Sequence, residues 1–351
     1  MDIAAVRGHL AAGQLIPAQP LALEENGRFA ERYQRALARY YVAAGAGGLA
    51  VGVHSTQFEI REPRHGLFRP VLELASRTID EELARAPRPF IKIAGICGRT
   101  VQAVAEAALA REMGYEAGLL SVAIFREEAE AAILEHCAQV AAVIPIIGFY
   151  LQPSVGGRVL PYSFWRRLAA IPNLVAVKIA PFNRYQTLDV VRAVVDSGRS
   201  DVALYTGNDD TIVTDLWTPF AFADAGGPEP RRIVGGLLGH WGVWTHAAAA
   251  LFEELKRERA AGTMATKWLE RSVAVTDMNA AVFDPSHRFK GCIPGILEVL
   301  RRQGLVPSNR CLNPHETLSP GQAEELTRVI RSYPSLIDDD FVAAGRDRWL
   351  A

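Results

Sequence analysis

The chain alternates eight short apolar runs with longer stretches in which apolar residues recur every three to four positions. Short continuous apolar runs are typical of strands covered on both faces, and the longer stretches are typical of amphipathic helices. Regular alternation of the two predicts repeated strand–helix units around a parallel sheet. The predicted strands are Leu15–Ala18, Gly48–Val53, Phe90–Cys97, Ala117–Val122, Ile144–Gln152, Leu174–Ala180, Val202–Gly207 and Ile233–Leu238.

Eight such units predict a (β/α)8 TIM barrel within the α/β class. An open sheet is the less favoured alternative, because no glycine-rich dinucleotide fingerprint follows the first strand. We predict a catalytic barrel domain over residues 1–262. Residues 263–351 are rich in helix-forming sequence and no low-complexity linker precedes them, so they are predicted to form a helical C-terminal extension packed on the barrel.

Composition restricts the partners that this chain is expected to have. With 38 basic and 39 acidic residues it offers no electrostatic footprint for nucleic acid or an anionic membrane. Its four cysteines lack paired spacing, which argues against a zinc site or a disulfide framework and favours a reducing, cytoplasmic environment. The amino-terminal residues do not resemble an export signal. We therefore expect a cytoplasmic protein that binds small molecules.

Active sites of such barrels lie at the carboxyl ends of the strands, and Lys178 lies near the end of the sixth predicted strand. Its apolar neighbours, including Val177 and Ile179, predict a desolvated amine, and desolvation lowers the pKa of an ammonium group. A neutral amine can attack the carbonyl of a 2-oxo acid and form a Schiff base. Taken alone, the lysine fits equally well a rim position paired with a carboxylate.

Lys92 also interrupts an apolar strand, but it lies near the start of that strand. It is therefore interpreted as a structural lysine in an ion pair. Tyr150 precedes Lys178 by about one strand–helix unit, so the two residues are expected to end neighbouring strands and to face the same mouth. A phenol in that position can relay protons. The alternative for Tyr150 is packing at the top of the barrel.

Other polar residues follow the ends of predicted strands and are candidates for substrate binding. Because the carboxyl ends of the strands meet at one face, these side chains are expected near Lys178. The candidates are Ser55, Thr56, Asn208 and His240.

Together these residues resemble the dihydrodipicolinate synthase / N-acetylneuraminate lyase family of Schiff-base-forming aldolases. The resemblance extends from about Ile16 to Pro314 and rests on three segments in the family's order. The segment V-G-V-H-S-T-Q is similar to the family's hydroxyl pair, G-F-Y-L-Q-P to its Tyr-x-x-Pro, and L-V-A-V-K-I-A followed by Y-T-G-N-D-D to its lysine strand and the next turn.

The resemblance implies a role for each matching residue. Lys178 would form the imine, Tyr150 would relay protons, and Ser55 with Thr56 would bind the carboxylate of the 2-oxo acid. It implies no cofactor beyond the covalent lysine imine and no metal, and it implies a homo-oligomer, either a tetramer or a dimer.

The chain also departs from the family pattern. Gln57 and Phe58 replace the usual Gly-Glu after the hydroxyl pair, and the fourth strand ends in S-V-A-I-F-R without the second relay tyrosine. The family's carboxylate-binding arginine would fall at Val155, which makes Arg158 the candidate replacement. The lysine-biosynthetic synthase itself is therefore not the expected activity.

Three functions are consistent with this sequence. The leading hypothesis is a class I aldolase or lyase acting on pyruvate or another 2-oxo acid. The first alternative is a keto-deoxy sugar acid dehydratase that uses the same lysine imine. The second alternative is a non-catalytic barrel that binds a ligand, which the altered Gly-Glu and second-tyrosine positions favour.

Overall fold

The computed structural model describes residues 2–222 and 230–351 and divides into two compact units. The first unit comprises Met1–Gln14 and Ile91–Leu237, and the second comprises Leu15–Phe90 and Leu238–Ala351. Neither division falls at residue 262. The predicted C-terminal extension therefore shares its unit with residues 15–90.

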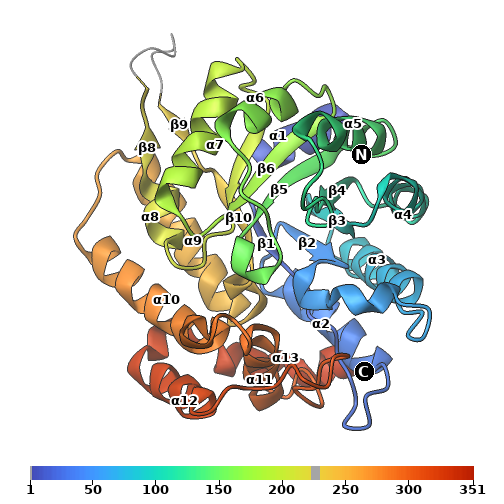
Figure 1. The fold of residues 1–351 in the computed structure, drawn as a ribbon. Helices are drawn as coiled ribbons and strands as arrows, with labels where there is room; N and C mark the ends of the chain where they lie inside the picture. The colour runs from blue at the N-terminus through green and yellow to red at the C-terminus, as the bar shows by residue number, and fades with distance from the viewer. Residues whose placement is uncertain (1, 223–229) are drawn as a thin grey trace. The chain divides into compact units, whose positions relative to one another are not determined.

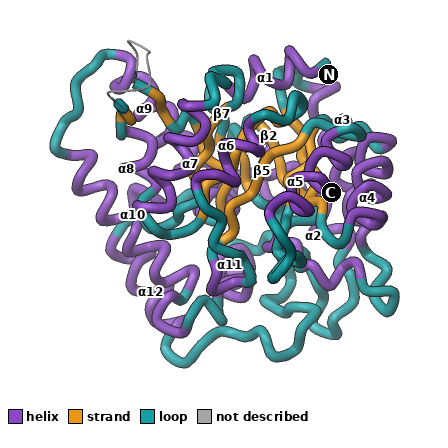
Figure 2. The backbone as a smooth tube through the Cα atoms, turned by 45° about the horizontal axis from the view of Figure 1, so that its top comes forward, coloured by secondary structure: helices purple, strands orange, loops and turns teal. Residues whose placement is uncertain are grey.

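The first unit contains a parallel sheet in which the order of strands is β10, β7, β6, β5, β4, β3. All residues of these strands are buried, which explains why they read as continuous apolar runs. Figure 2 shows β5 and β7 among the strands of this unit. The strands are β3 (Ile91–Ile96), β4 (Ala117–Leu120), β5 (Ile146–Leu151), β6 (Leu174–Ala180), β7 (Ala203–Thr206) and β10 (Gly235–Leu238).

Each helix of the first unit except α1 follows one of its strands, and α6 packs against α7 (Figure 1). The sequence predicted neither α1 nor α8, since both are short and α1 buries only Val6 and Leu10. It also missed the antiparallel pair β8 (Pro219–Phe220) and β9 (Arg231–Arg232). The helices are α1 (Ile3–Ala11), α4 (Thr100–Glu112), α5 (Glu130–Ala141), α6 (Tyr162–Ala169), α7 (Arg184–Asp196) and α8 (Ile212–Trp217), with a 3-10 turn η3 at Pro153–Val155.

The second unit contains the parallel strands β1 (Leu15–Pro17) and β2 (Gly48–Val51). Helix α13 packs along α2, where Trp349 lies 5.4 Å from the ring of Tyr40 (Figure 1). Its helices are α2 (Glu31–Ala43), α3 (Phe68–Arg85), α9 (Thr245–Ala260), α10 (Lys267–Phe283), α11 (Cys292–Arg302), α12 (Gln322–Ser332) and α13 (Asp339–Leu350), with 3-10 turns η1 (His54–Thr56), η2 (Phe58–Arg61), η4 (His240–Gly242), η5 (Pro285–His287) and η6 (Pro334–Leu336).

All eight predicted strands form, and each end lies within two residues of its predicted position. They belong to one eight-stranded parallel sheet and alternate with helices, and further helices follow at the C-terminal end. The predicted fold class, a (β/α)8 barrel with C-terminal helices, is confirmed. No helix in the two described stretches combines the length and apolar character that crossing a membrane requires.

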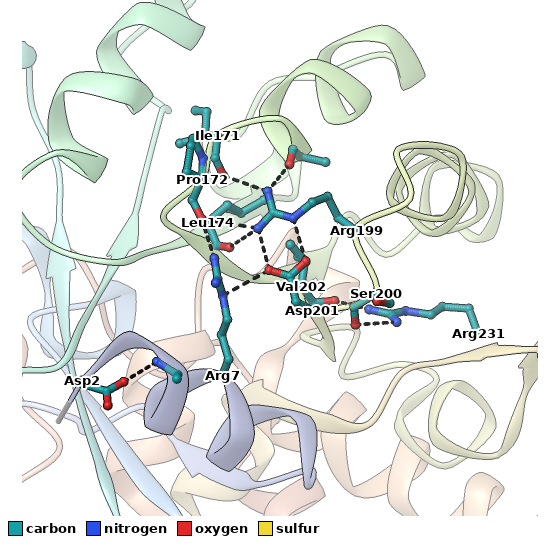
Figure 3. A network of polar contacts seen from close by, with 12 residues as sticks. Asp2, Arg7, Ile171, Pro172, Leu174, Arg199, Ser200, Asp201, Val202 and Arg231 are labelled. Carbon is teal, nitrogen blue, oxygen red and sulfur yellow. Dashed lines mark hydrogen bonds and ion pairs between the residues drawn. The ribbon is translucent and has the colours of Figure 1, made fainter.

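The start of β6 is held by an arginine network within the first unit (Figure 3). The Arg199 guanidinium donates to the carbonyl oxygens of Ile171 and Leu174, at 3.0 and 3.2 Å, and pairs with Asp201. Arg7 of α1 pairs with the same carboxylate at 3.2 Å. These bonds satisfy carbonyl groups just before and at the beginning of the strand that carries the candidate lysine.

Candidate active site

Lys178 lies in the last half of β6 and is only 9% exposed. Its Nζ lies 4.4 Å from the centroid of the Phe149 ring on the neighbouring strand β5. On its other side, Gly207 follows β7, where an added Cβ would approach Lys178 Cε to 2.8 Å. Glycine at position 207 therefore leaves the space that the lysine side chain occupies.

Tyr150 lies near the end of β5, on the strand beside that of Lys178, but its side chain faces the other way. In the strand register Lys178 lies opposite Phe149, and Tyr150 lies opposite Ile179. Successive side chains of a strand point to opposite faces, so Tyr150 faces α6 while Phe149 faces the lysine. The Tyr150 ring lies 4.9 Å from that of Trp165, and the Leu160 N–H donates to its hydroxyl at 3.3 Å.

This placement corrects the expectation that Tyr150 and Lys178 face the same mouth. Tyr150 is fully buried, and desolvation raises the pKa of its phenol. The structure therefore gives no support to a proton relay through Tyr150. The aromatic group beside the lysine is instead Phe149, which carries no exchangeable proton. Phe149 directly precedes Tyr150 in the sequence. Tyr150 was selected because it matched the family motif, and no motif pointed to Phe149.

A buried polar network lies just beyond the ends of β6 and β7. Its centre is Asp215 of α8, which is 0% exposed. One carboxylate oxygen accepts from Thr206 at 2.7 Å and from Asn208 at 2.9 Å, while the other pairs with Arg184. Burial raises the pKa of Asp215, and the bonds from Thr206, Asn208 and Arg184 oppose that rise. No sequence motif pointed to this residue.

Asn208 was predicted to bind substrate, but its side chain is engaged within this network. Its amide nitrogen donates to Thr187 at 3.1 Å and to Asp215 at 2.9 Å, while its amide oxygen accepts from the Phe182 N–H at 3.0 Å. Phe182 has a positive φ of 51° in the loop that leaves β6. Asn208 therefore holds the loop that follows the lysine strand, and the predicted substrate contact is not supported.

The neighbouring residues Asn183 and Arg184 have structural partners too. The Asn183 side chain accepts from two backbone N–H groups at the start of α7, which makes it the cap of that helix. Arg184 pairs with Asp215, donates to Thr218 at 3.0 Å and lies 5.3 Å from the Phe220 ring. The Arg184 guanidinium is therefore held by a neighbouring carboxylate.

Arg158 was the predicted replacement for a carboxylate-binding arginine. Its Nη1 donates to the carbonyl oxygens of Phe125 and Glu128, at 3.2 and 2.8 Å. It thus joins the loop after β5 to the loop after β4. Carbonyl groups of a long loop need donors as much as a substrate does, and the substrate contact of Arg158 stays a prediction.

In the second unit, Ser55 and Thr56 form part of η1, directly after β2 as predicted. Ser55 donates to the Ala18 carbonyl at 3.0 Å, and Thr56 donates to the Gln19 carbonyl at 2.7 Å. Both hydroxyl groups therefore already donate their protons to backbone carbonyl groups of the segment that follows β1. A hydroxyl has a single proton to donate. Carboxylate binding by the hydroxyl and backbone N–H groups of Ser55 and Thr56 stays a prediction.

Gln57, at the departure from the family's Gly-Glu, keeps a backbone conformation that favours glycine. Its φ is 68°, and its side chain is 1% exposed. The Leu312 N–H donates to Gln57 Oε1 at 2.6 Å. The side chain thus fastens the loop to the segment after α11, and this bond offsets the cost of a left-handed conformation for a residue with a Cβ.

We expect Gln57→Ala to lower the free energy of unfolding by about 2 kcal/mol, because it keeps the left-handed strain and removes the bond to Leu312. Gln57→Gly removes the same bond but relieves the strain, so its loss should be smaller by about 1 kcal/mol. Urea unfolding of both variants measures the difference. A glycine variant less stable than the alanine variant would contradict this assignment.

His240, another predicted substrate-binding residue, begins η4 and is 5% exposed. Desolvation lowers its pKa from 6.5 to about 4, and its hydrogen bond with Asn279 of α10 opposes this shift. The imidazole is therefore neutral at pH 7 and packs 6.3 Å from the Trp244 ring. Its substrate contact stays a prediction.

The lowered pKa of His240 makes stability depend on pH. Between about pH 6.5 and pH 4 the unfolded chain binds a proton that the folded chain does not, so stability is lost as pH falls. The contribution is at most about 1.4 kcal/mol per pH unit. We expect that, between pH 6.5 and pH 5, the free energy of unfolding measured with urea falls by about 2 kcal/mol less in His240→Gln than in the parent. The same substitution at the exposed His315 should leave the slope unchanged.

Comparison with known proteins identifies the relatives of this chain. A model of the dihydrodipicolinate synthetase family matches residues 11–220. The chain belongs to this family. The match includes Ser55, Tyr150 and Lys178, so it confirms the predicted resemblance. No functionally curated protein matches the chain.

Solved structures of the dihydrodipicolinate synthetase family share the fold at low sequence identity. Dihydrodipicolinate synthase from Oceanobacillus iheyensis is 17% identical, with a TM-score of 0.73 over 95% of this chain and 100% of that one. A protein from Clostridium difficile solved with mannosamine is 16% identical, with a TM-score of 0.71 over 92% and 99%. A prophage protein of the family from E. coli K12, solved with pyruvate, is 16% identical, with a TM-score of 0.72 over 92% and 98%.

Asp209 and Asp210 follow β7 in the segment that resembles the family's Gly-Asp-Asp turn. Burial raises the pKa of Asp210. Within the described ranges, no three His, Cys, Asp or Glu side chains gather as a metal site would need. Asp209 and Asp210 directly follow Asn208 in this turn.

Proposed function

We propose that this chain is a Schiff-base-forming aldolase or lyase whose Lys178 takes pyruvate or another 2-oxo acid. The observation that carries the proposal is a lysine only 9% exposed in a strand that resembles the family's lysine strand. Burial favours the neutral amine, which is the nucleophilic form. The structure of a relative with pyruvate supports the choice of first substrate.

The chemistry requires no group beyond the lysine and the substrate. The amine attacks the C2 carbonyl, and loss of water from the carbinolamine leaves a protonated imine. This cation draws the electron pair of a bond at C3, so that a C–C bond can form or break there. The Phe149 ring, 4.4 Å from Nζ, presents its π system to the positive charge.

The proton transfers of this reaction are proposed to proceed without Tyr150, whose hydroxyl binds the Leu160 N–H on the α6 side. Water and groups of the substrate itself are then the available carriers. The site also differs from the family pattern at Val155, where the carboxylate-binding arginine would fall. Both differences favour an activity other than the lysine-biosynthetic synthase.

A barrel that binds a 2-oxo acid without turning it over is the second candidate. It is favoured by the engaged hydroxyls of Ser55 and Thr56 and by the orientation of Tyr150. A keto-deoxy sugar acid dehydratase that uses the same imine is a variant of the leading proposal. Product analysis separates it from an aldolase, because dehydration leaves the carbon skeleton intact. For all three, we propose a cytoplasmic homo-oligomer, a dimer or tetramer, that needs no cofactor.

The test is adduct trapping with a panel of 2-oxo acids, including pyruvate and a keto-deoxy sugar acid. The protein is incubated with each acid and borohydride, and the modified peptide is identified by mass. The proposal expects a reduced adduct on Lys178. Lys92 is equally buried, at 6% exposed, and serves as an internal control that should stay unmodified. An unmodified Lys178 across the panel would overturn the covalent mechanism.

A further inference from the structure

An open cavity of about 680 Å³ lies in the second unit, beside the C-terminal ends of α2, α3 and α13. Its volume falls within the range of small-molecule sites, roughly 300–1,000 Å³. Four arginines line it, and Glu82 is the only acidic side chain in the lining. The arginines are Arg39, Arg85, Arg88 and Arg348.

Arg39 of α2 brings a guanidinium that is not fully hydrogen-bonded. Its Nη1 donates to the Trp349 carbonyl at 2.8 Å, which joins α2 to α13. Its Nε is buried and makes no hydrogen bond with any residue of the described ranges. The nearest carboxylate oxygen, of Glu82, lies 3.6 Å from this Nε. A buried donor of this kind usually has a hydrogen-bond acceptor, whereas this Nε has only the ion pair with Glu82 among the described residues.

The single negative charge of Glu82 cannot neutralise the four arginines that line the cavity. Its Oε1 already accepts from Arg85 at 2.5 Å, so a single carboxylate serves two guanidinium groups. Arg88 uses Nη2 to donate to the Val42 carbonyl at the end of α2, at 2.8 Å, and its pKa is lowered by burial. The charge of Arg88 is thus partly desolvated, and no described residue forms an ion pair with it, so a bound anion would offset the cost of its burial.

We propose that this cavity binds a small, multiply charged oxyanion of the class of phosphorylated metabolites. Guanidinium groups bind phosphate oxygens through pairs of parallel hydrogen bonds, and each arginine here still has donors to spare. The four arginines of the lining outnumber its acidic side chain, Glu82, and this favours a ligand with more than one negative charge. Alanine and valine side chains of the lining, Val42, Ala43 and Ala86, can cover an uncharged part. The inference does not involve Lys178 or the proposed imine.

The test is isothermal titration calorimetry of the protein. Inorganic pyrophosphate is the probe, and inorganic phosphate is the smaller anion for comparison. The variant R85Q/R348Q removes two lining charges. Its control, R64Q/R346Q, removes two charges away from the cavity. Arg64 and Arg85 match closely, since each pairs with a glutamate and their side chains are 68% and 65% exposed. Arg346 lies in α13 beside Asp347, two residues before Arg348.

We expect saturable pyrophosphate binding that R85Q/R348Q weakens by roughly tenfold or more, while R64Q/R346Q changes it by less than about twofold. Phosphate should bind more weakly than pyrophosphate. Glu82→Gln removes the competing carboxylate and should tighten binding several-fold, and circular dichroism checks that every variant is folded. Absence of saturable binding by the parent, equal weakening in the two double variants, or no tightening by Glu82→Gln would each overturn the proposal.

Discussion

Replacing Lys178 with alanine is expected to remove the borohydride-trapped adduct completely and to lower kcat on a 2-oxo acid substrate by at least roughly a thousandfold. The amine is the nucleophile of the proposed mechanism, and no other lysine lies in β6. Removing a nucleophile removes the covalent route altogether. Peptide mass after trapping and steady-state kinetics measure the two effects.

The matched control is Lys92→Met, which removes the other buried strand lysine. Methionine keeps an unbranched side chain of similar length, so the strand should tolerate it, and the adduct on Lys178 should persist. Because both lysines are buried in strands, the comparison separates the chemistry from the general effect of losing a buried amine. Turnover or an adduct that survived Lys178→Ala would contradict the imine mechanism, whereas binding without turnover in the parent would favour the second candidate.

The strands were predictable because burial on both faces leaves an uninterrupted apolar signal. Each of the eight appears as a short apolar run, with polar, glycine or proline residues at most of its ends, and helices α11 and α12 carry clear apolar periodicity. The missed elements lack these signals. Helix α1 buries two side chains only, and the pair β8–β9 has two residues per strand.

The candidate site was predictable only as far as the lysine strand. Residue spacing placed Tyr150 and Lys178 at the ends of adjacent strands, as observed, but spacing does not determine the face to which a side chain points. A register irregularity between Ile146 and Ile147 precedes the pairing of Phe149 with Lys178. A shift of one residue reverses every side chain beyond it. The face of Tyr150 therefore depends on a feature that carries no sequence signature.

The roles of the polar residues at strand ends stay predictions. Asn208, Arg158, Ser55 and Thr56 all stand where substrate-binding groups are found, and all four bind protein groups in this structure. Loops after strands leave backbone carbonyl and N–H groups that require partners. A sequence shows that a donor is present, but the acceptor nearest to it depends on packing.

The second large effect is expected from Asp215→Ala, which should lower the free energy of unfolding by about 3–5 kcal/mol. The carboxylate is 0% exposed and is the shared acceptor of Thr206, Asn208 and Arg184. Its removal leaves a hydroxyl, an amide and a half-exposed guanidinium without that acceptor, and each lost partner is costly when buried. Urea unfolding of the variant and the parent at pH 7 measures the difference.

Two controls decide whether the loss reflects this network. Glu31→Ala breaks the exposed pair with Arg35 and should cost no more than about 0.5 kcal/mol, because water replaces the partner of an exposed charge. Asp215→Asn keeps the shape and one acceptor oxygen, so its loss should be intermediate. Asn208 also holds the Phe182 N–H beyond β6, so Asp215→Asn is expected to slow adduct formation on Lys178 without preventing it. A loss below about 1 kcal/mol in Asp215→Ala would mean that the three donors find other acceptors, and that the loop after the lysine strand is held by packing.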